Sequence, residues 1–149
     1  MREADINQAT TSCIRAWHLL RLAHDRVSGR LGAELARECG LTIHEFDVLF
    51  YLRVHSNEDV RMSALLDAVP LSQPALSRLV ARLTERGLVG RCGIETDGRA
   101  VIVSLTDAGA ALIDRASVLH ARIVHDALTS KFTESEQTAL LATLDQIGR

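Results

Sequence analysis

A chain of 149 residues is long enough to bury a hydrophobic core and short enough to predict a single domain. Hydrophobic residues make up 47% of it but aromatic residues only 3%, so we expect a core of leucine, valine, isoleucine and alanine, as in helix-rich proteins. The net charge of −2 excludes a globally basic nucleic-acid-binding protein, so any DNA-binding surface must be local.

The sequence carries no targeting or membrane signal. No apolar run approaches the roughly eighteen residues of a membrane-spanning helix. The first residues, MREADINQATTS, lack the basic and apolar segments of a signal peptide, so we expect a cytoplasmic protein. Cys13, Cys39 and Cys92 are odd in number and form no CxxC pair, which argues against a disulfide framework or a zinc site. We expect no cofactor and no metal.

The first two predicted helices are separated by a glycine. The apolar pattern predicts a long helix over residues 5–38, followed by Gly40 in the left-handed conformation that ends many helices. Thr42 and Glu45 have the spacing of a capping box, which predicts a helix over 43–55. The apolar stripe of the first helix comprises Leu20, Ala23, Val27, Leu31 and Leu35.

Two shorter helices follow, over 61–69 and 72–86. Pro70 separates them, because the residue before a proline is pushed out of helical geometry. Ser72 is expected to cap the second of them, and Pro74 fits its first turn. Two short helices joined by a tight turn have helix-turn-helix form.

The rest of the chain predicts a hairpin and two more helices. β-rich runs on either side of Asp97-Gly98 predict a hairpin over 88–105. Thr106-Asp107 opens a helix to about residue 130, and a capping box at Thr133 opens a final helix. A small winged domain has little surface to cover the apolar residues of these helices, so we expect self-association. Those residues are Ile113, Leu119, Ile123, Leu128, Leu140, Leu141, Leu144 and Ile147.

The helix over 72–86 has two different faces when its residues are placed at intervals of about 100°. The face expected to be buried carries Leu76, Leu79, Val80 and Leu83. The opposite face carries Pro74, Ser77, Arg78, Ala81 and Arg82, with Ser72 and Gln73 at its N-terminus. Small residues and arginines suit a DNA major groove, and hydroxyl, amide and N–H groups can meet phosphates or base edges. An ordinary amphipathic helix also shows outward arginines, so this face alone does not establish DNA binding.

The hairpin tip supplies a second candidate contact. Arg99 can enter the minor groove next to a helix seated in the major groove. Asp97 would repel phosphate, so its expected role is to hold Arg99 by a charge-assisted hydrogen bond. The combination of helix and hairpin tip favours a DNA-binding function.

Three segments, LTIHEFDVLFYL, SQPALSRLVARLTERGLVGR and ETDGRAVIVSLTDAG, resemble the multiple-antibiotic-resistance-regulator (MarR) family of winged helix-turn-helix transcription factors. The resemblance spans nearly the whole chain. It implies a mainly α fold with a small β-wing, in one domain of residues 1–149. Within it, 42–105 would form the winged helix-turn-helix (recognition helix 72–86, wing 88–105), and 5–38 and 107–149 a helical dimerisation layer.

The resemblance also implies a homodimeric repressor that reads a pseudo-palindromic operator in double-stranded DNA. Arg99 would be the wing arginine, while Gly98 stands where the family commonly has a second basic residue. The residues implied to face the major groove are Ser72, Gln73, Pro74, Ser77, Arg78 and Arg82.

Family members often release DNA when a small phenolic or aromatic carboxylate binds, so the resemblance implies an effector of that class. Arg15, Trp17 and His18 are the candidate ligand-binding residues. An arginine can grip a carboxylate, a histidine can bond a phenol, and an indole can pack on an aromatic ring. Arg15 could instead pair with an acidic residue across the dimer, and Trp17 could be interface core.

Two other functions stay open. Some relatives sense peroxides through a thiolate on the first helix, where Cys13 has Arg15 nearby to favour a thiolate. A helical protein-interaction module without DNA binding is the second alternative, but it has no need for the hairpin tip. An enzyme is not expected, because the sequence has no GxSxG, no HExxH and no phosphate-binding glycine loop.

Overall fold

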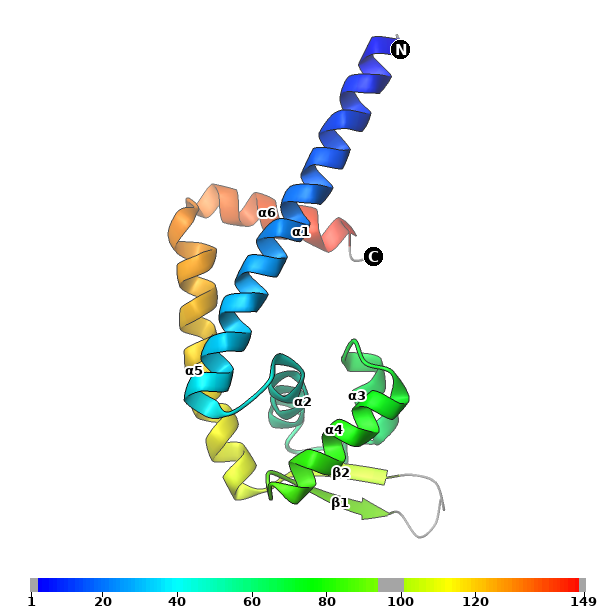
Figure 1. The fold of residues 1–149 in the computed structure, drawn as a ribbon, viewed down its shortest axis with the longest axis vertical. Helices are drawn as coiled ribbons and strands as arrows, with labels where there is room; N and C mark the ends of the chain where they lie inside the picture. The colour runs from blue at the N-terminus through cyan, green and yellow to red at the C-terminus, as the bar shows by residue number, and fades with distance from the viewer. Residues whose placement is uncertain (1–2, 94–100, 148–149) are drawn as a thin grey trace. The chain divides into compact units, whose positions relative to one another are not determined.

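The computed structural model describes residues 3–93 and 101–147 and divides them between two compact units. The winged unit is Gly32–Arg122, and the terminal unit comprises Met1–Leu31 with Ile123–Arg149. In chain order the elements are α1 (Glu3–Cys39), α2 (Ile43–Val54), α3 (Met62–Ala68), α4 (Gln73–Glu85), β1 (Val89–Gly93), β2 (Val101–Leu105), α5 (Asp107–Ala127), the 3₁₀ helix η1 (Thr129–Lys131) and α6 (Glu134–Ile147) (Figure 1). The mainly α fold with a small β-wing is confirmed.

The helix starts and stops follow the local sequence signals. Gly40 has φ +62°, the left-handed conformation predicted for it. Thr42 and Glu45 form the expected capping box, with the Thr42 hydroxyl accepting from the Glu45 N–H and the Glu45 carboxylate accepting from the Thr42 N–H. The predicted box at Thr133 is also present. The helix predicted to reach about residue 130 ends earlier, at Ala127, and η1 follows it.

The wing is a two-stranded antiparallel sheet in which Val89 pairs with Leu105 and Gly93 with Val101. In the winged unit, α4 contacts β1, while α2 and α3 contact β2 (Figure 1). The backbone at Arg61 forms an isolated antiparallel bridge to Ile102, on the edge of β2 opposite the one that pairs with β1. The hairpin tip, with Asp97, Gly98 and Arg99, lies outside the described residues.

The core of the winged unit consists of aliphatic side chains and Phe46, as composition predicts. Its fully buried members include Leu35, Leu41, Val48, Leu49, Leu52, Leu65, Leu76, Val80, Leu83, Val103 and Ile113. Only the C-terminal part of the predicted α1 stripe is buried within the chain, because Leu31 and Leu35 are covered while Leu20 is exposed. The long helix therefore needs different partners along its length.

One sequence expectation about the apolar C-terminal residues is wrong in part. Self-association is predicted to cover all of these apolar residues. Three of them are already buried within the single chain: Ile113, Leu119 and Ile123. They follow one another at helical spacing with Ala116, on the face of α5 that supplies the chain's own core. Leu128, Leu141, Leu144 and Ile147 do remain exposed.

Among residues 3–93 and 101–147, no helix has a stretch long and apolar enough to cross a lipid bilayer. The same residues contain no group of three or more histidine, cysteine or acidic side chains placed to hold a metal ion.

Candidate DNA-binding surface

The α4 helix has the two faces predicted for it. Leu76, Leu79, Val80 and Leu83 are buried and anchor it to the winged unit. On the opposite side, Ser72, Gln73, Pro74, Ser77, Arg78 and Arg82 are exposed together. The structure thus brings the six predicted helix residues onto one accessible surface, which we call the reading face.

The turn before α4 places its N-terminus at the protein surface. The Leu71 N–H donates to the Val69 carbonyl over 2.8 Å, and the Leu76 N–H donates to the Ser72 carbonyl over 2.9 Å. Ser72 occupies the N-cap position with extended backbone, as predicted, but its side chain makes no capping hydrogen bond. Its hydroxyl and the first N–H groups of α4 are therefore available to an external acceptor, such as a phosphate oxygen.

The three arginines that recur every fourth residue in α4 do not share one role. Arg78 and Arg82 are exposed, and their side chains make no hydrogen bond or ion pair with another residue of the described parts. Arg86, at the end of the helix, donates to the Gly40 carbonyl over 2.9 Å and lies 3.3 Å from a Glu45 carboxylate oxygen. The first two arginines can neutralise an external anion, whereas Arg86 holds the fold.

The Arg86 contact joins the recognition helix to the junction of α1 and α2. Glu45 is only 5% exposed, and its second carboxylate oxygen accepts from the Thr42 N–H and hydroxyl at 2.9 and 3.1 Å. A buried carboxylate with three hydrogen bonds is satisfied, and removing Arg86 would leave its charge uncompensated. Sequence reasoning missed this role for Arg86, because its partners lie some forty residues away.

A compact turn fixes the wing against the end of α4. Gly87 has φ +69°, and its carbonyl accepts from the Thr106 hydroxyl over 2.7 Å. The Thr106 hydroxyl in turn accepts from the Gly109 N–H over 3.0 Å, which caps α5. The Thr106 N–H donates to the Leu88 carbonyl over 3.1 Å. These bonds set where β1 leaves the recognition helix, and so where the wing lies.

Two side-chain contacts join α2 to α5 in the winged unit. Arg53 donates two hydrogen bonds to the Asp114 carboxylate, at 2.8 and 3.2 Å, and this bonding holds the pKa of Asp114 below its ordinary value. The Phe46 and His120 rings stack with centroids 4.7 Å apart. Partial burial lowers the pKa of His120, which favours a neutral imidazole in the stack.

Comparison with known proteins identifies this architecture. The sequence model described as MarR family matches residues 39–100. The chain is 35% identical over 110 residues to the HTH-type transcriptional regulator PecS of Dickeya dadantii, covering 73% of this chain and 66% of PecS. It is 33% identical over 127 residues to the HTH-type transcriptional repressor NicR of Pseudomonas putida, covering 85% of this chain and 78% of NicR.

The chain belongs to the MarR family. A solved relative, Sco3205 of Streptomyces coelicolor in complex with DNA, superposes with a TM-score of 0.82 at 25% identity, covering 89% of this chain and 83% of Sco3205. This MarR-family chain is accordingly a DNA-binding transcriptional regulator and not an enzyme. The alternative of an interaction module without DNA binding is set aside on the same grounds.

The effector candidates of this MarR-family chain lie on the terminal part of α1. Arg15, Trp17 and His18 are all exposed, and Trp17 keeps 66% of its surface. Cys13 is exposed on the same helix, and none of Cys13, Cys39 and Cys92 is in a disulfide. These side chains are therefore accessible on the surface of the single chain.

Alanine substitutions at the N-cap residues Thr42 and Ser72 are expected to affect different properties, stability in the first case and DNA affinity in the second. Thr42→Ala removes a capping hydrogen bond and is expected to cost roughly 1 kcal/mol of unfolding free energy. Ser72→Ala removes no such bond, so stability should change little while DNA affinity falls. Chemical denaturation and a DNA-binding titration of both variants measure the two effects. A loss of stability in Ser72→Ala equal to that in Thr42→Ala would contradict the absence of a capping bond at Ser72, and an unchanged DNA affinity would contradict the assignment of its hydroxyl to DNA.

Proposed function

We propose that this MarR-family chain is a homodimeric repressor that binds a pseudo-palindromic operator and releases it when a small aromatic or phenolic carboxylate binds. The reading face is the observation that supports the DNA-binding part of this proposal. It joins small side chains, a vacant N-cap hydroxyl and two unpaired arginines opposite a fully buried stripe. The wing residues Asp97 and Arg99 are proposed to contact the adjacent minor groove.

The homodimer is supported by apolar surface on the terminal unit. Its exposed apolar side chains are Ile14, Trp17, Leu19, Leu20, Leu128, Phe132, Leu141, Leu144 and Ile147. Leaving so many large apolar residues in water is unfavourable, and a second copy would cover them. We therefore assign 5–38 and 107–149 to a dimerisation layer and 42–105 to the winged helix-turn-helix, within one domain. Two copies place two reading faces on successive half-sites.

Repression is supported by NicR, a relative named as a transcriptional repressor. A mobility shift on DNA next to the chain's own gene, followed by a reporter fusion to the same DNA, tests both parts. A shift with lower reporter output in the presence of the protein supports repression. Higher output contradicts repression, and no shift on any such fragment contradicts this choice of operator.

The effector part predicts a separation of function at Arg15. Arg15→Ala should fold and bind operator as the parent does, yet keep the DNA when an aromatic acid such as benzoate is added, because the guanidinium that grips the carboxylate is gone. Arg26→Ala, an exposed arginine on the same helix, is the matched control and should respond like the parent. Mobility shifts over a benzoate titration measure the response. An unchanged response in Arg15→Ala would remove Arg15 from the site.

A further inference from the structure

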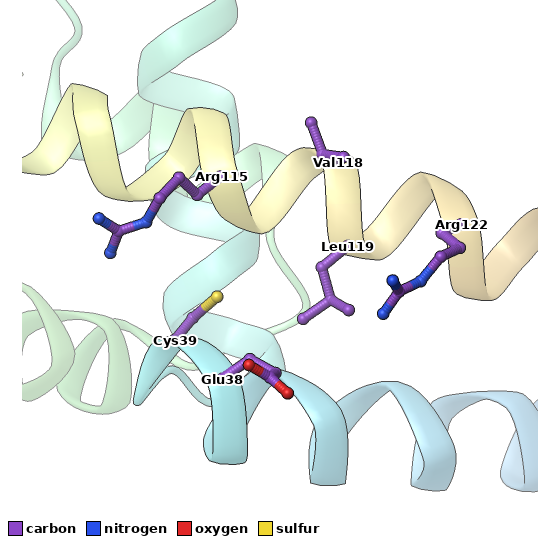
Figure 2. A pocket seen from close by; sticks show the side chains of 6 residues that line it. All are labelled: Glu38, Cys39, Arg115, Val118, Leu119 and Arg122. Atoms are coloured by element: carbon purple, nitrogen blue, oxygen red, sulfur yellow. The ribbon is translucent and has the colours of Figure 1, made fainter.

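A pocket of about 330 Å³ lies within the winged unit, between the end of α1 and one face of α5 (Figure 2). Its volume falls in the lower range of sites that hold small organic ligands. The pocket includes no residue of α4 and none of the effector candidates on α1, so it is separate from both proposed sites. Its lining residues are Glu38, Cys39, Arg115, Val118, Leu119 and Arg122.

Two of the arginine side chains that line the pocket have no acidic partner in the described residues. Glu38 lies 2.7 Å from a guanidinium nitrogen of Arg37, which also contacts Glu34. The side chains of Arg115 and Arg122 make no hydrogen bond or ion pair with any residue in the described ranges. Arginine carries its charge at all physiological pH values, so these two guanidinium groups present positive charge to a ligand.

The two arginines are separated in a way that selects the shape of a ligand. Their positions on α5 are two helical turns apart, a rise of roughly 10 Å. Figure 2 shows their guanidinium groups on either side of the Leu119 side chain, with the Cys39 sulfur facing the same space. Leu119 and Cys39 thus give the space between the two guanidinium groups an apolar wall, and the Glu38 carboxylate lies near this wall. A compact anion such as phosphate would reach one arginine and leave this wall uncovered.

We propose that this pocket binds an elongated dicarboxylate, with one carboxylate on Arg115, the other on Arg122, and an apolar chain over Leu119 and Cys39. Guanidinium groups pair with carboxylates through two parallel hydrogen bonds. Glu38 opposes additional negative charge in the middle of the ligand, which favours a simple chain diacid over a more highly charged acid.

Such a ligand would join the end of α1 to α5 next to Gly40, whose carbonyl is held by Arg86 from the recognition helix. Occupancy of the pocket is therefore expected to change operator affinity. This regulatory step rests on the proposed function, whereas the binding step does not.

Suberate is the probe for the binding step, used with the full chain in the absence of DNA. In a Cys13→Ser/Cys92→Ser background, suberate is expected to slow alkylation of Cys39 by N-ethylmaleimide, and octanediol is not. Calorimetry should show affinity weakened about tenfold by Arg115→Gln or Arg122→Gln, since each removes a charge-assisted pair. Glu38→Gln should tighten binding a few-fold. Arg61→Gln, an exposed arginine of the same unit outside the pocket, should leave it unchanged.

The binding proposal is overturned if suberate neither protects Cys39 nor gives a calorimetric signal, or if Arg61→Gln weakens it as much as the pocket variants do. Octanoate binding as tightly as suberate would overturn the diacid assignment. A mobility shift with and without suberate then tests regulation. If suberate binds the protein but operator affinity does not change, the regulatory step is refuted. If the protein does not shift the DNA even when suberate is absent, the result contradicts the proposed operator instead.

Discussion

Gly109→Ala is expected to destabilise the chain severely, although it adds one methyl group. A Cβ at this position would overlap the backbone carbonyl oxygen of Leu88, and it would lie 3.2 Å from the Leu105 side chain. Backbone atoms cannot rotate away, and that carbonyl already accepts the Thr106 N–H at the base of the wing. We expect a loss of about 3 kcal/mol or more, seen as a fall in Tm of roughly 6–12 °C.

Gly29→Ala is the matched control, because nothing lies within 4 Å of a Cβ added there. Gly29 is an exposed position inside α1, where alanine should stabilise by about 0.5–1 kcal/mol. The two glycine-to-alanine changes should thus shift the thermal midpoint in opposite directions. Equal behaviour of the two variants would show that close backbone approach is not the reason for glycine at 109.

Arg82→Ala and Arg78→Ala are expected to weaken operator binding without unfolding the protein. Both side chains are exposed on the reading face and unpaired in the described chain, so their removal exposes no buried charge. A lost base contact should reduce affinity roughly tenfold to a hundredfold and relax specificity at one base pair. A lost phosphate contact should instead reduce the slope of log affinity against log salt by about one. Titrations at several salt concentrations distinguish the two outcomes.

Arg26→Ala is the control for these variants, since it removes an exposed arginine of α1 that lies outside both the reading face and the pocket. It should leave the salt slope unchanged. If Arg78→Ala and Arg82→Ala both keep the parent's affinity and slope at moderate salt, the reading face is wrongly assigned.

Local signals predicted most of the helices and turns because their causes are local. The capping boxes at Thr42 and Thr133 depend on a side chain three residues away, and Gly40 and Gly87 end helices through their own φ angles. The two faces of α4 follow from the helical period alone. For the same reason, six of the eight predicted DNA-contact residues lie together on α4 and its N-cap, while Asp97 and Arg99 stay predictions.

The sequence by itself determined the mainly α architecture, the wing and the reading face, since each is written in residues close together along the chain. Only the tertiary structure decided which apolar side chains stay exposed and which charged side chains stay unpaired, and so which of them can contact another molecule. The sequence does not distinguish two sets of aliphatic residues in the C-terminal helices. One set is buried in the chain (Ile113, Leu119 and Ile123), and the other is exposed (Leu128, Leu141 and Ile147). The sequence does not distinguish Arg86 from Arg78 and Arg82 either. In the structure, however, the Arg86 guanidinium donates hydrogen bonds to Gly40 and Glu45. Burial and ion pairing depend on partners distant in sequence, so periodicity can give a residue its face on a helix but not its partner.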